Sequence, residues 1–418
     1  YFGPDHDAGQ DQVAWGNWSA NGETYSPQTP MLNDIMTIQR IYGANTSTRS
    51  ANTVYGFNSN ITGTLAEIYD FTQNAHPILC LYDAGGTDTL DLSGWNTNSR
   101  IDLNAGAFSD CNGMTSNLSI AYNCVIENLT TGSGQDTLTG NAVANVFVAG
   151  SGTDLLQGNG GNDLLDGGSG TDTAVFTYNL NNYRISYNGS AFQIEDQTSA
   201  RDGTDTLQQI EQLRFADQTT SIHYAAATPG QTTRLISDSY LAYQVSAHNG
   251  DAVLTDLNVN RNGVTLYTDI ERLQFTDITV GLDVGAGQHT GEVYRLYLTV
   301  LGRNPETDPV GCGFWIDKLD RNILNTEQMV GYFLDSTEFV TRFGGTTNAN
   351  DAFVNLMYLN LLGRDGHPDS GFSFWLNVLN NHQASREQVV VGFMESPENI
   401  TNAAPLIGDA PTFQQWLG

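Results

Sequence analysis

The sequence predicts a mainly β protein, in which a parallel β-roll is extended by two β repeats and followed by an α-helical C-terminal domain. Three internal repetitions carry this prediction. A nine-residue unit recurs five times over 131–175, a 60-residue unit recurs twice over 176–283, and a unit of similar length with helical periodicity recurs twice over 284–418. Repetition at a fixed short period is typical of solenoids, in which each unit packs against its neighbours.

The nonapeptides keep glycine, acidic and apolar residues at fixed positions. They read TGSGQDTLT, GNAVANVFV, AGSGTDLLQ, GNGGNDLLD and GGSGTDTAV. The sixth position holds aspartate in four units and Asn145 in the second, and the eighth position is apolar throughout. A glycine-rich linker is the alternative, but a linker has no reason to keep an apolar residue in register. The spacing therefore indicates short strands whose eighth residue points inward.

The same spacing predicts cation binding. Glycines at the second and fourth positions permit tight turns in which backbone carbonyls converge, and the sixth-position carboxylate adds a charged oxygen. Such an all-oxygen cluster suits Ca²⁺ better than Mg²⁺, which demands stricter geometry. The candidate ligands are Gly132, Gly134, Asp136, Asn145, Gly150, Gly152, Asp154, Gly161, Asp163, Gly168, Gly170 and Asp172.

The ions should lie between turns that are two units apart, because a coil of two turns and two strands uses eighteen residues. The expected pairs are Asp136 with Asp154, Asn145 with Asp163, and Asp154 with Asp172. We expect the second pair to be the weakest, since Asn145 lacks a charge and its unit has valine where glycine belongs.

Composition narrows the function classes. The chain has 46 acidic and 16 basic residues in 418, a net charge of −30, which argues against nucleic-acid binding and favours folding where calcium is plentiful. No apolar run is long enough to span a membrane. The four cysteines form no CxxC pair; Cys111 and Cys124 bridging a loop and free buried thiols remain equal alternatives.

The first segment, 1–58, contains PMLNDIMTIQRIYGAN, in which Leu32, Ile35, Ile38 and Ile41 recur at helical spacing. It predicts one amphipathic helix packed on a larger body, with short strands after it. TVYGFNSN, DAGGTDTLDLSG, RIDLNAGAFSD, NLSIAYNCVIEN and the nonapeptides then follow in an order that resembles serralysin-type secreted zinc metalloproteases over roughly 1–175. The resemblance implies a C-terminal remnant of a metzincin-like catalytic domain over 1–58 and an RTX calcium-binding β-roll over 59–175.

The resemblance also implies a calcium site at the head of the roll. Its ligands, matched position by position, are Arg49, Ala51, Thr53, Asp83, Gly85, Gly86, Asp88, Val125 and Glu127. Ala51 stands where the family has glycine, so carbonyl ligation there requires that Ala51 avoid a positive φ. Val125 stands where the family has threonine. For Asp83 and Asp88 the alternative role is ordinary turn formation.

Zinc chemistry is not encoded in this stretch of chain. By resemblance, Tyr1 matches the tyrosine after the family's Met-turn that reaches the catalytic zinc. The family's motif HExxHxxGxxH is absent, because none of the seven histidines is followed by glutamate. We therefore expect Zn²⁺ only if an N-terminal half that carries the motif is present, and no catalytic residue within this chain.

Two further duplications follow the roll. IEQLRFAD (210–217) and IERLQFTD (270–277) mark the tandem β repeats of 176–283, where Asp202 and Asp205 belong either to a cation site or to a simple turn. The tandem helical repeats of 284–418 resemble a domain of unassigned function often appended to RTX proteins. Their acidic loops RNPETDP and RDGHPDS lack the EF-hand spacing and favour helix capping, and Trp315 and Trp375 are expected in the core.

These features predict a secreted, extracellular or cell-surface protein. It is expected to bind several calcium ions and to fold on them after type I export, as the C-terminal region of a serralysin-like metallopeptidase. The alternative is a non-catalytic surface-layer, filament or adhesive subunit. In either case 284–418 is the expected contact region for other copies of the chain or a cell-surface component, with no nucleic-acid partner and no membrane span.

Overall fold

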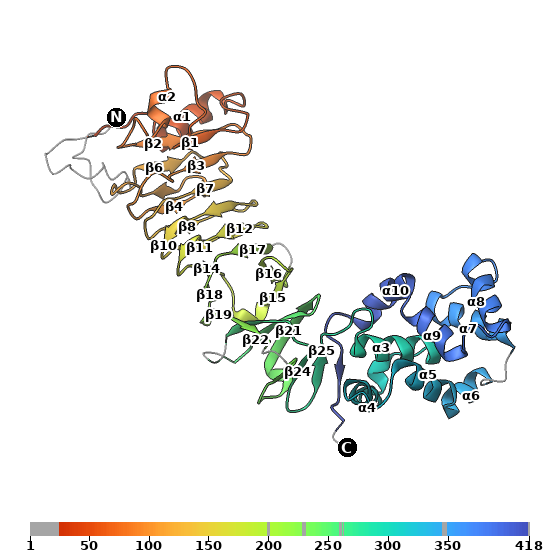
Figure 1. Ribbon diagram of the computed structural model, residues 1–418. Helices are drawn as coiled ribbons and strands as arrows, with labels where there is room; N and C mark the ends of the chain where they lie inside the picture. The colour runs from red at the N-terminus through yellow and green to blue at the C-terminus, as the bar shows by residue number, and fades with distance from the viewer. Residues whose placement is uncertain are drawn as a thin grey trace. The chain divides into compact units, whose positions relative to one another are not determined.

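The computed structural model describes residues 25–198, 201–227, 231–258, 261, 263–344 and 349–416, so the predictions for Tyr1 fall outside the described residues. The chain divides into two compact units, Tyr1–His223 with Leu257–Val264 and Tyr224–Asp256 with Thr265–Gly418. The predicted fold class is confirmed, because short parallel strands dominate the first unit and helices dominate the end of the second (Figure 1).

The first unit begins with the expected helix, α1 (Leu32–Tyr42), which ends at Gly43 with φ of 82°. Only Leu32 of this helix is buried, whereas 54% of Ile38 and 64% of Ile41 is exposed. Among the residues described, the predicted apolar face of this helix is therefore buried only at its N-terminal end. A single helical turn, α2 (Ala66–Tyr69), follows strand β1.

Two parallel sheets form the roll. One contains, in spatial order, β1 (Val54–Gly56), β3 (Thr89–Asp91), β7 (Asn128–Thr130), β9 (Val146–Val148), β12 (Leu164–Asp166) and β17 (Thr204–Gln208). The other contains β4 (Arg100–Asp102), β8 (Thr137–Thr139), β11 (Leu155–Gln157), β14 (Thr173–Val175) and β18 (Gln212–Arg214). Since β1 pairs with β3, the roll's sheet begins a few residues before residue 59.

The register of these sheets follows the nonapeptide. Leu138 lies beside Leu156 in one sheet and Phe147 beside Leu165 in the other, each pair eighteen residues apart in sequence. All four side chains are fully buried, as expected for the eighth position. Burial of a large apolar side chain contributes roughly 1.5–3 kcal/mol, so stacking the coils supplies the core that one coil lacks.

Further strands, of two to eight residues, complete the first unit, and the last of them, β19 (Thr219–Ala226), ends in residues of the second unit. The others are β2 (Leu79–Leu81), β5 (Phe108–Ser109), β6 (Leu118–Ile120), β10 (Ser151–Gly152), β13 (Ser169–Gly170), β15 (Tyr183–Tyr187) and β16 (Phe192–Asp196), with the 3₁₀ turn η1 (Leu180–Asn182). The first 60-residue repeat joins the roll directly: its hairpin β15–β16 continues antiparallel into β17, and β17 pairs in parallel with β12.

The second unit opens with the second β repeat. Its elements are β20 (Thr233–Leu235), η2 (Tyr240–Ala242), β21 (Tyr243–His248), β22 (Asp251–Asp256), β23 (Val264–Thr268), β24 (Arg272–Gln274), β25 (Thr279–Gly281) and, from the end of the chain, β26 (Thr412–Phe413). β21 and β22 form an antiparallel hairpin, whereas β24 lies between β20 and β25. β26 pairs with β25, so the chain returns to this repeat after the helices.

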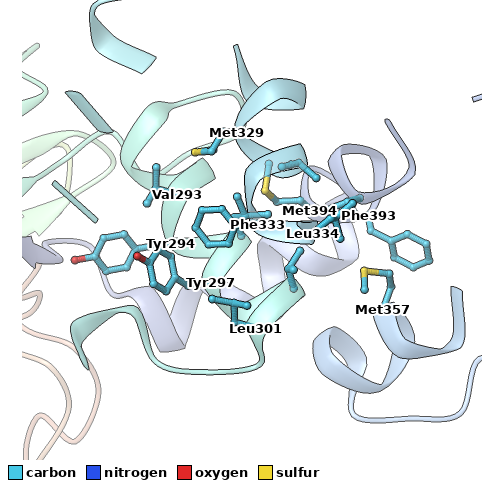
Figure 2. Packing of buried hydrophobic residues seen from close by; sticks show 14 of the residues in the cluster. Val293, Tyr294, Tyr297, Leu301, Met329, Phe333, Leu334, Met357, Phe393 and Met394 are labelled. Carbon is cyan, nitrogen blue, oxygen red and sulfur yellow. The ribbon is translucent and has the colours of Figure 1, made fainter. Parts of the chain in front are cut away.

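Helices follow the second repeat in two matching series. The first is α3 (His289–Leu296), the π-helical turn η3 (Tyr297–Leu301), η4 (Pro305–Thr307), α4 (Pro309–Asp320), α5 (Thr326–Leu334) and α6 (Thr337–Phe343). The second is α7 (Asn350–Leu362), α8 (Ser370–Asn380), α9 (Arg386–Met394) and α10 (Pro397–Ile407). Figure 2 shows their shared core, in which Tyr297, Phe333 and Phe393 come from η3, α5 and α9. Trp315 and Trp375 pack against this core, as the sequence predicted.

The acidic loops of the helical repeats cap helices, which confirms the prediction. Asp308 accepts a hydrogen bond from the backbone N–H of Gly311 at the start of α4, and Asp369 accepts one from Gly371 at the start of α8. These contacts satisfy backbone donors that a helix leaves unpaired at its N-terminus.

The four cysteines are all free and buried. Of the two alternatives for Cys111 and Cys124, the structure therefore has free buried thiols and not a disulfide bridge. Within the residues described, no helix combines the length and the apolar character that crossing a bilayer requires.

Candidate metal sites of the roll

The sixth-position residues form a ladder along one edge of the roll. The backbone N–H of Ser99 donates to Asp136 Oδ1 (2.6 Å), that of Asp136 to Asp154 Oδ1 (2.7 Å), and that of Asp154 to Asp172 Oδ1 (2.8 Å). The structure therefore places the two aspartate pairs predicted on this side one coil apart, as the period of eighteen residues requires.

A second ladder runs along the opposite edge. The backbone N–H of Asn145 donates to Asp163 Oδ1 (2.7 Å), which brings the third predicted pair together. The side-chain amide of Asn145 donates to the carbonyl oxygen of Glu127 (3.0 Å). Asn145 therefore has a hydrogen-bonding role that a carboxylate at that position would lack.

Five aspartates at the turns of the roll each keep one oxygen free. Among the described residues, Oδ2 of Asp88, Asp136, Asp154, Asp163 and Asp172 is buried and lacks any hydrogen-bond partner. Burial raises the pKa of Asp88 and Asp154 to about 6, and it also raises the pKa values of Asp136 and Asp172. These carboxylates are therefore charged groups held away from water without a counter-charge, a costly arrangement that a bound cation would relieve.

The glycines of the turns permit close approach between coils. A Cβ at Gly152 would overlap the carbonyl oxygen of Gly134, and one at Gly170 would overlap that of Gly152. Positive φ, expected at the second and fourth positions, is found at Gly150, Gly152, Gly161, Gly168 and Gly170. Gly132 and Gly134 lack it, and there the requirement is only for space, because a Cβ at Gly134 would approach Thr97 O within 2.5 Å.

The head of the roll repeats the same arrangement with residues from three segments. The N–H of Thr53 donates to Asp88 Oδ1 (2.7 Å), and the N–H of Asp88 donates to Glu127 Oε2 (2.7 Å). A Cβ at Gly86 would lie 2.8 Å from Ala51 O, so the carbonyl of Ala51 reaches this turn. Ala51 has no positive φ, which meets the condition set by its replacement of glycine.

The other predicted head residues make different contacts. Both oxygens of Asp83 accept hydrogen bonds, Oδ2 from the Tyr55 hydroxyl (2.8 Å) and Oδ1 from the N–H of Gly85 (3.0 Å). The Arg49 guanidinium donates to the Tyr55 hydroxyl (2.8 Å). Val125 is 43% exposed. The structure thus gathers Ala51, Thr53, Gly86, Asp88 and Glu127 at one turn, and it ties the side chains of Asp83 and Arg49 to Tyr55.

The donor set of the ladders fits calcium. It offers aspartate oxygens without partners beside glycine turns whose backbones touch, which is the oxygen-rich, adaptable environment that Ca²⁺ prefers. Asp136, Asp154, Asp163, Asp172 and Asp88 would supply the charge and the turn carbonyls the remaining oxygens. Within the described ranges, no group of three or more His, Cys, Asp or Glu side chains is placed to hold a metal ion.

The sequence did not predict Ser99 and Glu211 as ladder members, and it gave Asp205 two alternatives, a cation site or a simple turn. Ser99 lies at one end of the first ladder, before Asp136, and Glu211 lies at its other end, where Glu211 Oε2 accepts the N–H of Asp172 (2.8 Å). In the second ladder, Asp205 Oδ1 accepts the N–H of Asp163 (2.9 Å). For Asp205 and Glu211 the signal in the sequence was an acidic residue two places before an apolar one, whereas Ser99 has no such signal. Asp205-Thr206-Leu207 and Glu211-Gln212-Leu213 match Asp163-Leu164-Leu165 in this respect.

Stacked glycine-rich turns on two parallel sheets define a β-roll protein of the nonapeptide type. Comparison with known families gives the particular group: the family described as Peptidase M10 serralysin C terminal matches residues 44–260, more than half of the chain. The chain belongs to this family. The helical repeats match a domain of unknown function, DUF4214, over residues 287–343 and 332–403.

Individual relatives agree with this assignment. Metalloprotease AprA of Pseudomonas entomophila strain L48 is 46% identical over 131 residues, which are 31% of this chain and 26% of that protein. Serralysin C of Dickeya chrysanthemi is 50% identical over 110 residues, 26% of this chain and 22% of that protein. The chain thus spans about a quarter of the length of the curated relatives it matches.

A solved structure, the extracellular lipase LipA from Serratia marcescens, matches 45% of this chain and 43% of that chain at 13% identity, with a TM-score of 0.14. At that score the likeness carries no argument.

Proposed function

We propose that this chain is the calcium-binding C-terminal region of a serralysin-like metallopeptidase that is exported and folds on calcium outside the cell. One observation carries the proposal. Five buried aspartates, Asp88, Asp136, Asp154, Asp163 and Asp172, stack at the turns of the roll with one unpartnered oxygen each.

Calcium would act here as a folding ligand. Without a cation, closing the roll brings charged carboxylates together and removes them from water, which opposes folding. With Ca²⁺, binding free energy adds to the free energy of folding. Where calcium is scarce the chain stays open, as passage through an export channel requires, and where calcium is abundant it closes.

Peptide hydrolysis is assigned to a polypeptide that carries this chain together with a zinc-binding catalytic domain. Support comes from the family match and from relatives that are themselves named serralysin or metalloprotease. The test is the intact mass and N-terminal sequence of the protein from its natural source, with zinc and calcium assayed in the same sample. We expect a longer species with HExxH, about one zinc and several calcium ions; a species without zinc would refute the peptidase assignment.

A second candidate is a structural subunit that assembles through the helical repeats. It is favoured by apolar side chains left on the surface of these repeats, with 58% of Phe374 and 59% of Tyr332 exposed. Light scattering at rising calcium concentration tests it, with Phe374→Ser as the comparison. Calcium-dependent assembly that the substitution abolishes, without peptidase activity, would favour this candidate; a monomer under all conditions would exclude it.

A further inference from the structure

We propose that the roll does not end with its last nonapeptide, and that residues 201–207 supply one more turn, which holds a calcium ion between Asp163 and Asp205. This site goes beyond the contiguous nonapeptides and belongs to the first 60-residue repeat. It rests on the proposed calcium-binding function of the roll, and its test is separable from the test of that function.

The pairing of β17 with β12 sets the register of the additional turn. Leu164 lies beside Thr206 and Leu165 beside Leu207, just as they lie beside Val146 and Phe147 on their other side. Residue 207 therefore occupies the eighth position, residue 205 the sixth and residue 203 the fourth. The sequence separation is 42 residues instead of eighteen, because the hairpin β15–β16 is inserted between the last nonapeptide and this turn.

The contacts of a nonapeptide turn recur at this position. The N–H of Asp163 donates to Asp205 Oδ1 (2.9 Å), as the N–H of Asn145 donates to Asp163 Oδ1 (2.7 Å). The N–H of Thr206 donates to Asp163 O (2.7 Å). Gly203 has φ of 81°, and a Cβ there would overlap the carbonyl oxygen of Gly161. The segment thus follows the roll in backbone as well as in side chain.

The charges at this turn call for a cation. Asp163 and Asp205 are 1% and 2% exposed, and Asp163 Oδ2 lacks a hydrogen-bond partner among the described residues. That oxygen faces its own glycine turn, where a Cβ at Gly158 would overlap it. The neighbouring basic residue, Arg201, is engaged elsewhere, since its guanidinium pairs with Asp196 at 2.5 and 2.8 Å.

Backbone oxygen is present at the same turn. Arg201 O lies 3.0 Å from the position of a Cβ at Gly160, so this carbonyl meets the turn of 158–163. Two carboxylates with converging carbonyls form an all-oxygen set with adaptable geometry, which selects Ca²⁺ over Mg²⁺ and over metals that prefer nitrogen or sulfur.

The second 60-residue repeat provides an internal comparison. Sixty residues after Gly203 it keeps a glycine, Gly263, again with positive φ (71°). Sixty residues after Asp205 it has Thr265. The repeat therefore forms its turn without a carboxylate at this position, and turn formation alone does not account for Asp205.

The experiment measures calcium bound per molecule of the full chain by native mass spectrometry across a calcium titration. Asp205→Asn keeps the oxygen that accepts the Asp163 N–H but removes the charge, and Thr265→Ala is the matched control in the second repeat. We expect Asp205→Asn to lose one bound calcium and the control to lose none. An unchanged stoichiometry in Asp205→Asn overturns the proposal.

Two further measurements distinguish the absence of this site from a failure of the variant to fold and from a failure of the proposed function. Circular dichroism at saturating calcium reports whether Asp205→Asn has folded. Hydrogen exchange of 204–208 in the unmodified chain tests the site without any substitution. We expect the protection of this segment from exchange to rise with calcium, and the absence of a rise would overturn the proposed site. If the unmodified chain binds no calcium at all, the proposed function fails with it; if it binds calcium and Asp205→Asn loses none, only this inference fails.

Discussion

Asp154 is the residue on which two successive turns of the roll depend. Its Oδ1 accepts the N–H of Asp136 (2.7 Å), and its own N–H donates to Asp172 Oδ1 (2.8 Å). Asp154→Ala would leave the buried N–H of Asp136 unpaired, at about 1–3 kcal/mol, and would remove a free carboxylate oxygen. We expect it to cause the largest rise, among single substitutions in the ladder, in the calcium concentration needed for folding, measured by circular dichroism.

The two roles of this carboxylate are separable. Asp154→Asn keeps an acceptor for the N–H of Asp136 and removes only the charge, so it should retain stability without calcium and lose calcium response. Asp166→Asn, at the ninth position of its unit, is the control and should behave like the unmodified chain. An unchanged calcium midpoint for both Asp154 variants would show that the eighteen-residue register does not define the ion sites.

His289, at the start of α3, gives the second unit a pH dependence. Its Nδ1 lies 2.6 Å from Asp320 Oδ1, and this hydrogen bond raises the pKa of His289 above its ordinary value of 6.5. A raised pKa in the folded state stabilises the protein below the unfolded pKa, and the contribution is lost as pH rises through the folded pKa. Both side chains are more than a third exposed, so the effect should be about 0–1 kcal/mol.

We therefore expect the melting temperature of the second unit to fall between pH 6 and pH 9, and to fall less in His289→Gln. Differential scanning calorimetry at fixed ionic strength measures both. An identical decline in the two proteins would mean that other groups carry the pH dependence.

At the scale of single elements, the short strands β10 and β13 show how little space separates the coils. Ser151 pairs with Ser169 and Gly152 with Gly170, and a Cβ at Gly170 would overlap the carbonyl oxygen of Gly152. Gly170→Ala must push two backbones apart, so we expect a loss of more than about 4 kcal/mol, the range reserved for disrupted structure.

Urea unfolding at saturating calcium measures that loss. The contrasting substitution is Gly331→Ala in α5, where the nearest atom to the new Cβ would be Glu387 Cγ at 3.9 Å. In a helix interior this exchange should stabilise by roughly 0.5–1 kcal/mol. A mild effect of Gly170→Ala, similar in size to that at Gly331, would mean that the coils are less tightly stacked than described.

The elements that the sequence predicted are those whose signal is local and periodic. The register of Leu138 with Leu156 follows from the nonapeptide alone, because neighbouring coils are contiguous in the chain. Asp205 takes the same kind of position after a 42-residue interval, and the hairpin inserted before it interrupts the period. The nine-residue period is therefore recognisable in the sequence up to the inserted hairpin and not beyond it.

Pairing between distant segments was not predictable in the same way. β26 contributes two residues to the second β repeat, where Thr279 lies beside Phe413. Two residues carry no periodicity, and nothing near them in the sequence indicates the partner strand. The burial of the ladder aspartates was not predictable either, because an aspartate in an ordinary turn and an aspartate stacked between coils have the same local sequence.

At the scale of the whole molecule, buried acidic side chains are stabilised in two ways. Guanidinium groups neutralise some of them: in the second unit Arg272 pairs with Asp283, and Arg295, which is 1% exposed, pairs with Glu395 at 2.7 Å. In the first unit Arg201 pairs with Asp196 at 2.5 Å. In the first unit the buried carboxylates with an unpartnered oxygen, those of Asp88 and the ladder, receive backbone N–H groups. Backbone donors reduce the cost of burying a carboxylate but bring no full opposite charge. The need for an external cation is therefore expected in the first unit.

This difference predicts two unfolding transitions with unequal calcium dependence. A ligand that binds only the folded state stabilises it by about 2.7 kcal/mol at a hundred times its Kd. Raising calcium from a chelated baseline should therefore move the transition of the roll to higher temperature, while the transition of the helical unit stays within the shift caused by matched ionic strength. Scanning calorimetry of the full chain in EGTA, in calcium and in magnesium measures this, with hydrogen exchange assigning each transition to its unit. Equal shifts of both transitions in calcium, or an equal response to magnesium, would mean that screening of the net charge of −30, and not occupation of the turns, stabilises the protein.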